Sequence, residues 1–246
     1  MRFDVLTLFP TMFEAVLCDS IIGRAQNSGI LEFNFIQIRD FSTDKHRRVD
    51  DYPYGGGAGM LMTPQPIYDA YMSIVGELDY KPLTIYMSPQ GKVFSQSVAA
   101  DLSKYEHIVI LCGHYEGVDQ RILDEIIDME LSIGDFVLTG GEIPAMAVID
   151  TVCRLVDGVL ASEDAYSSES HYDGLLEYPQ YTRPPEFMGR GVPDVLISGH
   201  HANIEKWKRE QSLINTFTKR PDLLDGKVLN DSDAKFIELL KNNNDF

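Results

Sequence analysis

Cysteine is scarce in this chain, and long apolar segments are lacking. The three cysteines among 246 residues, Cys18, Cys112 and Cys153, are odd in number and have neither metal-ligand nor disulfide spacing. No run of about 18 apolar residues occurs, which argues against a transmembrane helix. The N-terminus enters a strand-like pattern without the apolar segment of a signal peptide. We therefore expect free, buried thiols and a cytoplasmic protein that has no membrane partner.

Basic charge is also sparse, with 21 Lys and Arg against 38 Asp and Glu and a net charge of −17. A protein that binds nucleic acid normally needs a basic surface, and the overall composition of this chain does not indicate such a surface. The charge is uneven, however: residues 181–220 contain seven basic and four acidic residues, net +3. A second basic stretch is Arg39 with Lys45–Arg48. An acidic, solvated surface is the commoner explanation of such a pattern, so composition alone does not identify the partner.

Apolar periodicity predicts alternating strands and helices over the first 156 residues. Strands are expected at Phe3–Phe9, Leu31–Ile38, Leu83–Met87, His107–Cys112 and Met129–Ile133. Helices are expected at Met12–Ala25, from Pro64 to about Val75, after a Ser95 cap, at Val118–Ile127 and at Glu142–Val156. This alternation favours an α/β fold with a parallel sheet covered on both faces.

A polar, Ser-rich and acidic segment at Ala161–Asp173 reads as an interdomain linker. Beyond it, Trp207–Phe217 and Ser232–Leu240 have helical spacing and predict a small helical C-terminal domain. The expected division is therefore a cofactor-binding domain at 1–160, a linker at 161–173 and a helical domain at 174–246.

Three loops built from Gly, Pro and small residues follow predicted strands: Ser88–Gly91, Gly113–Gly117 and Ser132–Glu142. In an open α/β sheet, ligands bind in the crevice beyond the strand ends. Glycines there let backbone groups touch a ligand without an intervening Cβ. A ligand pocket and three ordinary turns remain about equally open on this evidence.

Familiar nucleotide and metal signatures are missing. The glycines of Gly55–Gly59 do not complete GxGxxG, because Met60 holds the last position, and no GxxxxGK[ST] occurs. His200 and His201 have no third ligand in a recognisable spacing, so no metal site is expected.

Asp173 is the strongest candidate for acid–base chemistry, because it stands where the linker meets the C-terminal domain. A turn or helix-cap aspartate is the commoner role for such a residue. Arg154, four residues beyond Asp150, could equally form a surface ion pair or place a charge in a cleft.

These residues together resemble the bacterial tRNA (guanine-N1)-methyltransferase family from end to end. The matching stretches are Asp4–Pro10, Arg39–Phe41, Lys45–His46, Asp50–Met60, Ser88–Gly91, Cys112–Gly113, Tyr115–Gly117, Ser132–Asp135, Gly141–Glu142, Asp173–Leu176, Tyr181–Pro184, Ser198–His201 and Arg220–Leu224. So many ordered matches make the resemblance highly specific.

The resemblance implies a trefoil knot at the C-terminal end of the α/β domain, in which the three loops hold a bent S-adenosylmethionine. It places Asp173 as the general base and Arg154 as the residue that stabilises the guanine. The implied cofactor residues are Tyr86, Met87, Ser88, Pro89, Gly113, Tyr115, Glu116, Ser132, Ile133, Gly134, Asp135, Phe136, Val137, Leu138, Gly140, Gly141 and Pro144.

The implied substrate is the anticodon arm of a tRNA that has a guanine just 3′ of the anticodon and another guanine before it. Methylation at N1 would give 1-methylguanosine and S-adenosylhomocysteine. The resemblance further implies an obligate homodimer with active sites at its interface, and support of activity by magnesium. The implied RNA-binding residues are Lys45, His46, Asp50, Gly59, Arg183, His201 and Lys208.

The chain departs from the family pattern at His114, where Arg is common, and at Phe136, where Tyr is common. Neither departure touches the expected base. Guanine N1 carries a proton that must leave, and an ordinary Asp, with a pKa of ~4, is too weak to remove it unaided. We expect partial desolvation of Asp173, and Arg154 acting on guanine O6, to close that gap. The alternatives are a knotted methyltransferase that acts on another RNA position and a non-catalytic RNA-binding protein.

Overall fold

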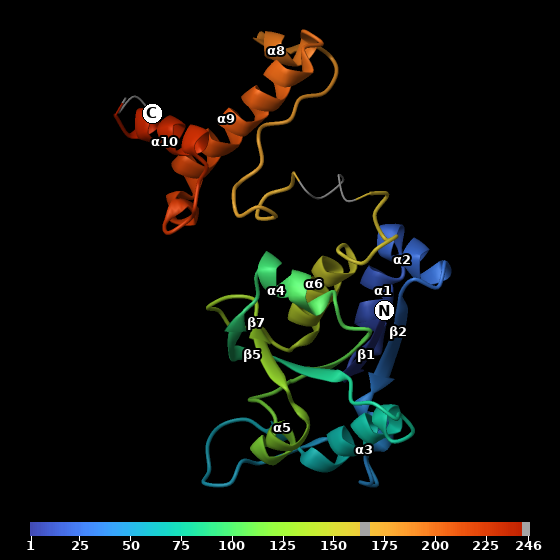
Figure 1. Cartoon of the computed structure of the whole chain (residues 1–246). Coiled ribbons are helices and arrows are strands. Elements are labelled where there is room, and N and C mark those ends of the chain that lie inside the picture. The colour runs from blue at the N-terminus through green and yellow to red at the C-terminus, as the bar shows by residue number, and fades with distance from the viewer. Residues whose placement is uncertain (163–167, 243–246) are drawn as a thin grey trace. The chain divides into compact units, whose positions relative to one another are not determined.

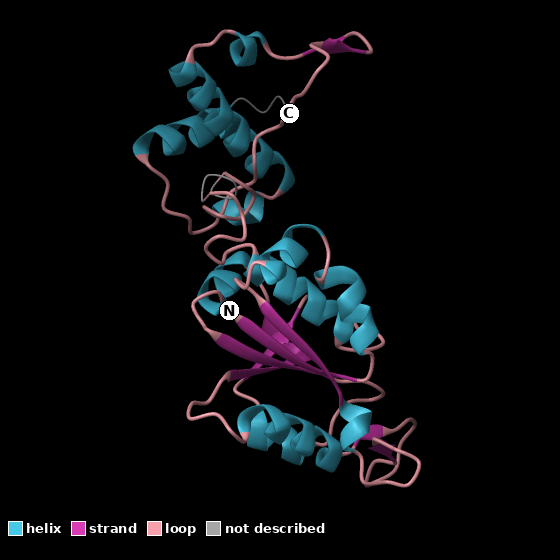
Figure 2. Cartoon of the chain, turned by 90° about the vertical axis from the view of Figure 1, so that its right-hand side faces the viewer, coloured by secondary structure: helices cyan, strands magenta, loops and turns pink. Residues whose placement is uncertain are grey.

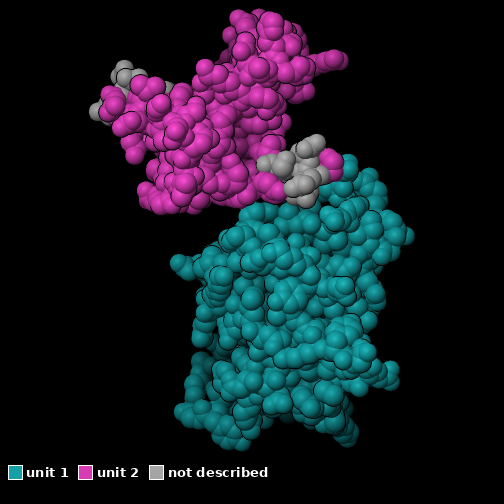
Figure 3. All heavy atoms as spheres, viewed as in Figure 1, with its two compact units in different colours: residues 1–161 teal, residues 162–246 magenta. Residues whose placement is uncertain are grey.

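The computed structural model describes residues 1–162 and 168–242. The chain forms two compact units, Met1–Ala161 and Ser162–Phe246, which Figure 3 colours separately. Residues 163–167 of the predicted linker 161–173 lie outside the described residues.

Unit 1 is built on a five-stranded parallel sheet in the order β2-β1-β6-β5-β7. Its strands are β1 (Arg2–Thr7), β2 (Glu32–Gln37), β5 (Leu83–Val93), β6 (His107–Cys112) and β7 (Met129–Ser132). Strand β6 is buried throughout and lies between β1 and β5, as expected for a central parallel strand. The predicted α/β class with a parallel sheet is therefore confirmed.

Helices cover both faces of this sheet (Figures 1 and 2). One layer contains α1 (Pro10–Leu17), α2 (Ser20–Asn27), α4 (Gln96–Leu102) and α6 (Glu142–Cys153), and the other contains α3 (Pro64–Val75) and α5 (Gln120–Ile126). Each face has its own apolar core, one around Phe13 and Val148 and the other around Ile67 and Ile122. A short 3-10 helix, η1 (Ile38–Phe41), and the paired strands β3 (Asp50–Asp51) and β4 (Leu61–Met62) complete the unit.

The single helix predicted at Met12–Ala25 is wrong, because the chain forms α1 and α2 with a break at Cys18 and Asp19. The Asp19 side chain accepts a hydrogen bond from the backbone N–H of Ser20 at 2.6 Å. Ser20 has a φ of 56°, which a continuous right-handed helix does not allow. An aspartate that caps a new helix overrides the apolar periodicity here.

The expectation that the strand from Leu83 ends at Met87 is also wrong. Strand β5 continues to Val93, and its pairing with β7 shifts register between Met87 and Lys92. A Cβ at Gly91 would lie 2.5 Å from the backbone carbon of Glu130, so only glycine allows this approach. The segment Ser88–Gly91 is therefore an irregularity within β5, which pairs with β7 in parallel on both sides of it.

Unit 2 contains helices α8 (Asp194–Ile197), α9 (His201–Lys219) and α10 (Asp231–Asn242), the 3-10 helix η2 (Pro221–Leu224), and the hairpin β8 (Glu186–Phe187) and β9 (Arg190–Gly191). Leu175, Leu213, Ile237 and Leu240 form its core. Helix α9 begins at His201, six residues before the predicted start at Trp207. Apolar spacing missed this first part because the segment is polar and has little apolar periodicity. Within the described residues, no helix has the length and apolar character needed to cross a membrane.

Candidate active site

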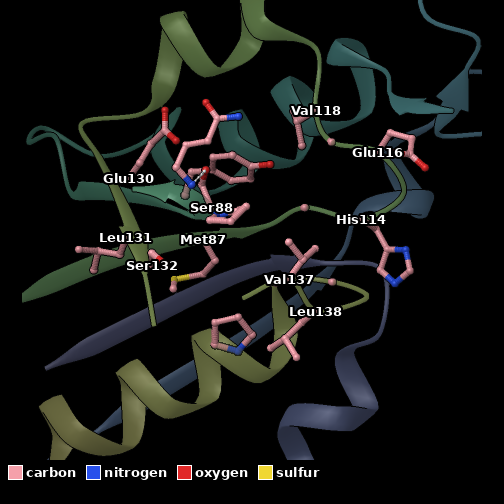
Figure 4. Close-up of a pocket in the computed structure, with 18 of the residues that line it drawn as sticks. Met87, Ser88, His114, Glu116, Val118, Glu130, Leu131, Ser132, Val137 and Leu138 are labelled. Carbon is pink, nitrogen blue, oxygen red and sulfur yellow. Dashed lines mark hydrogen bonds between the residues drawn. The ribbon is translucent and has the colours of Figure 1, made fainter. Parts of the chain in front are cut away.

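A pocket of about 270 Å³ opens beside the irregular part of β5 and at the carboxyl ends of β6 and β7 (Figure 4). Parts of all three predicted loops line it, together with Pro144 of α6. Every residue predicted to bind the cofactor lies in its lining except Asp135. Gln90, His114, Glu130 and Leu131 also line it and were not among the predicted residues. Gln90 lies inside the quoted Ser88–Gly91 motif, which was a signal for it, whereas Glu130 and Leu131 lie in β7 with none.

The loops converge because they bond to one another. The N–H of Gly141 donates to the carbonyl oxygen of Gly113 at 2.8 Å, and His114 forms an isolated bridge with Gly140. A Cβ on Gly141 would lie 2.8 Å from the Cα of Cys112. Glycine at position 141 is thus required for the loop Ser132–Glu142 to pack against the end of β6. A Cβ at this position would contact the protein itself before it contacted any ligand.

Tyr86, which lines the pocket, and the neighbouring buried thiol of Cys112 stay in their neutral forms. Burial raises the pKa of Tyr86 to about 12, and Glu130 and Cys112 add to the effect. Burial likewise raises the pKa of the Cys112 thiol well above its ordinary value, with Glu142 adding to it. A neutral phenol is a hydrogen-bond donor, so Tyr86 can donate at neutral pH. Glu142, also buried, accepts a hydrogen bond from Thr7 Oγ1 at 2.9 Å.

The Gly-rich segment Gly55–Gly59, which follows the basic stretch Lys45–Arg48, lies against one rim of this pocket. The N–H of Glu116 donates to the carbonyl of Met60 at 3.0 Å, and that of Met62 donates to Gly117 at 2.9 Å. Gly59 has a φ of 82°, and a Cβ there would lie 2.3 Å from Glu116 Cγ. Gly59 is therefore adjacent to the pocket, and Asp50 is held near it by the β3–β4 pairing.

The two departures from the family pattern lie at the same pocket. The His114 ring lies between those of Phe9 and Tyr115, with centroid distances of 5.2 and 5.3 Å. Arg39 donates to the Tyr115 hydroxyl at 3.1 Å, so a guanidinium still reaches this rim. Phe136 is exposed, and its ring packs against Gly134.

Asp173, the predicted base, belongs to unit 2 and lines a groove with Tyr178, Lys208 and Arg209. One carboxylate oxygen accepts from the N–H of Leu175 at 3.0 Å, and the other accepts from Arg209 Nη1 at 2.7 Å. Its side chain is 46% exposed. In this unit, then, the carboxylate is held in place but is not desolvated.

The remaining predicted residues lie in both units. Lys45 and His46 are exposed in the loop after η1, and Arg154 is half-buried just past the end of α6. In unit 2, Arg183 and His201 are exposed, and Lys208 pairs with Glu205 at 2.8 Å. The ammonium of Lys208 also lies 5.2 Å from the centre of the Tyr178 ring.

Comparison with known proteins agrees with this arrangement. Residues 1–226 match the family described as tRNA (Guanine-1)-methyltransferase TrmD. A tRNA (guanine-N(1)-)-methyltransferase of Ruminiclostridium cellulolyticum is 62% identical over 223 residues, which cover 91% of this chain and 96% of that protein. Its counterpart in Alkaliphilus oremlandii is 55% identical over 246 residues, covering 98% and 99%. The resemblance inferred from the motifs is confirmed, and the chain belongs to the tRNA (guanine-1)-methyltransferase family.

Proposed function

We propose that this chain transfers the methyl group of S-adenosylmethionine to N1 of the guanine immediately 3′ of the anticodon in tRNA. The products are 1-methylguanosine and S-adenosylhomocysteine. The observation that carries the proposal is the convergence of three loops on one pocket, in a chain of the tRNA (guanine-1)-methyltransferase family. The substrate and reaction type come from the family, and the pocket supplies a place for the reaction.

The residues that line the pocket suit the cofactor chemically. Met87, Leu138 and Pro144 offer apolar surface for a flat purine and an alkyl chain, and the loops add backbone polar groups. Glu116 and Glu130 bring negative charge to a ligand that carries a positive sulfonium. A Cβ on Gly113 would lie 2.7 Å from the Tyr86 hydroxyl, so glycine lets the backbone at position 113 approach Tyr86 in the pocket lining. When bound there, S-adenosylmethionine would supply an electrophilic methyl group.

We assign the proton transfer to Asp173 and charge stabilisation to Arg154. The Asp173 carboxylate takes the N1 proton as the new N–C bond forms, and Arg154 faces the negative charge that develops on guanine O6. Each oxygen of Asp173 has a further lone pair beyond the contacts with Leu175 and Arg209. The groove on unit 2 leaves the carboxylate half exposed, so RNA or a partner subunit has to exclude water from it.

The trefoil knot and the homodimer are parts of the same proposal. The hydrogen bond from Gly141 to Gly113 holds two loops that are distant in sequence against each other, and a knotted chain requires such close packing. We infer that Asp173 of one subunit serves the cofactor pocket of the other. Lys45, His46, Asp50, Gly59, Arg183, His201 and Lys208 would position the anticodon arm of the tRNA. A tRNA substrate also agrees with the expected cytoplasmic location.

Magnesium, which the sequence resemblance implies, has no assigned residue. Among the described residues, no group of three His, Cys, Asp or Glu side chains could hold a metal ion. No step of the proposed reaction is therefore routed through magnesium.

A transfer assay with labelled methyl groups tests the substrate. Two transcripts are compared, one with guanine just 3′ of the anticodon and one with adenine there. Label is expected only in the first, because adenine has an amino group in place of the guanine O6 that Arg154 is proposed to face. Equal labelling of both transcripts would favour a methyltransferase that acts on another position, and no labelling would favour an RNA-binding protein without this activity.

A further inference from the structure

Asp173 is fixed by a chain of contacts that reaches helix α10. Arg209 of α9 donates from Nη1 to Asp173 at 2.7 Å, and from Nε and Nη2 to Asp233 Oδ2 at 3.1 and 2.8 Å. Asp233 lies in the first turn of α10. The guanidinium of Arg209 thus bridges the carboxylates of Asp173 and Asp233, which are 60 residues apart in sequence.

The Asp233 end of this chain is rigid. Asp233 is only 5% exposed, and its Oδ2 also accepts from Asn230 Nδ2 at 2.8 Å. Asn230 in turn accepts from the N–H of Asp233 at 2.9 Å, the capping interaction that starts α10. The pKa of Arg209 is raised above its ordinary value, chiefly by the hydrogen bond to Asp233 and further by Asp173. The cation is therefore held from the side away from Asp173.

The turn that contains Asp173 is anchored to α9 independently. Leu175 is buried in the core of unit 2, and the N–H of Leu176 donates to Thr216 Oγ1 at 2.9 Å. Ser212 Oγ donates to the carbonyl of Leu176 at 2.6 Å, and Lys227 donates to the carbonyl of Asp173. The backbone of the turn is therefore fixed without Arg209. At the carboxylate itself, Arg209 adds a side-chain contact to Oδ2 beside the one that the N–H of Leu175 makes to Oδ1.

We propose that Arg209 is a positioning residue: held by Asp233, it fixes the Asp173 carboxylate in the orientation that receives the guanine N1 proton. This rests on the proposed function, in which Asp173 is the base. Asp233, which holds Arg209, and Asn230, which holds Asp233, both lie beyond residue 226, where the family match ends. Helix α10 therefore acts in the reaction through Arg209, and packing of the core is not its only role.

Arg209→Gln in the full-length chain tests the proposal through the split between kcat and KM. Loss of the guanidinium should lower kcat for methyl transfer about tenfold or more, with KM for S-adenosylmethionine and for tRNA within about twofold. Asp233→Asn should lower kcat less, because Arg209 remains but is no longer held. Arg209→Lys should give an intermediate loss, since a single ammonium cannot reproduce the fork of a guanidinium. Lys235→Gln, which removes an exposed cation of α10 outside the basic window 181–220, is the control and should leave kcat unchanged.

A double-mutant cycle separates positioning from a structural role. If Arg209 acts through Asp173, Arg209→Gln should not lower further the residual single-turnover rate of Asp173→Asn. Equal losses in the two backgrounds, or a change confined to the KM for tRNA, would overturn the proposal. Circular dichroism and thermal unfolding monitor the fold, and Arg209→Lys takes the place of Arg209→Gln in the cycle if the latter does not fold.

The same cycle distinguishes the failure of this inference from the failure of the base assignment. If Asp173→Asn keeps more than about a tenth of the wild-type turnover, the assignment of Asp173 as the base fails. The proposed role of Arg209 then fails with it. Asp173→Asn that is inactive, together with additive losses at Arg209, leaves the base in place and refutes only the positioning role.

Discussion

Asp173 lies within a well-defined set of contacts, which makes the effect of replacing it straightforward to interpret. Asp173→Asn keeps the shape of the side chain and can still accept at Oδ1 from the N–H of Leu175, but it cannot receive the guanine proton. Turnover should fall by more than tenfold, equivalent to at least ~1.4 kcal/mol in the activation barrier. Cofactor affinity, measured by calorimetry, should stay as in the wild type, because the pocket belongs to unit 1. If Asp173→Asn keeps more than about a tenth of the wild-type turnover, Asp173 is not the base.

Gly141 provides a second test at the scale of a single residue. In Gly141→Val the new Cβ would lie 2.8 Å from Cys112 Cα and 3.0 Å from the Gly113 nitrogen. Overpacking of this kind costs about 1–3 kcal/mol, so the melting temperature should fall by several degrees and cofactor affinity should fall with it. Gly191→Ala is the matched control, because nothing lies within 4 Å of its Cβ and its φ is not positive. Unchanged melting and affinity in Gly141→Val would show that the loops do not pack as described.

The residues of the pocket were predictable to the extent that they lie in recognisable motifs. Gly113, Gly141 and their neighbours were found because glycines after strands mark close approach of the backbone. Glu130 was missed because it lies within β7, and its place at the pocket depends on the pairing of β7 with the distant segment β5. The contact between Asp173 and Arg209 was also missed, since nothing in the local sequence relates positions 36 residues apart.

Secondary structure elements were predicted well where one rule dominated. The buried strand His107–Cys112 matches β6 at both ends, and the Thr63–Pro64 start of α3 was correctly identified. Apolar spacing failed between α1 and α2, where a local Asp19 cap breaks the helix. It also failed for β5, whose continuation beyond Met87 depends on pairing with β7, a contact between distant segments.

The basic window 181–220, which contains α9, makes a prediction at the scale of an element. Arg183 is exposed, with no ion pair to any residue that the structure describes, whereas Lys208 already pairs with Glu205. Charge reversal at Arg183 should therefore weaken tRNA binding more than reversal at Lys208. Each lost phosphate contact should reduce the slope of log K against log salt by about 0.7–0.9. Lys235→Glu on α10 is the control for net charge, and a slope equally reduced in all three variants would contradict specific contacts.

At the scale of the whole molecule, the sequence indicated a parallel α/β region and helices near the C-terminus, and both are observed. Periodicity could not indicate a knot or a dimer, because both depend on how the chain passes itself or a second copy. Those two features came only from the resemblance to the family and remain proposals here.

Subunit complementation tests whether two chains share each active site. Asp173→Asn subunits are mixed with Leu138→Lys subunits, in which a cation replaces an apolar residue that lines the pocket. Leu138 is partly exposed, so this change should leave the fold intact where Gly141→Val would strain it. Random exchange gives about half heterodimers, and about a quarter of all sites should then combine an intact pocket with an intact Asp173. Activity that stays at the level of the separate variants, with exchange confirmed by a tag, would place both in one chain.

The most direct test of the central claim is the position of the methyl group on the tRNA. Unmodified tRNA is incubated with the protein and S-adenosylmethionine, digested with nucleases and analysed by mass spectrometry against nucleoside standards. The account predicts 1-methylguanosine in the fragment that contains the anticodon, at the guanine just 3′ of it, and its loss with Asp173→Asn. A methyl group on another guanine atom, on another nucleotide, or still present with Asp173→Asn would contradict it.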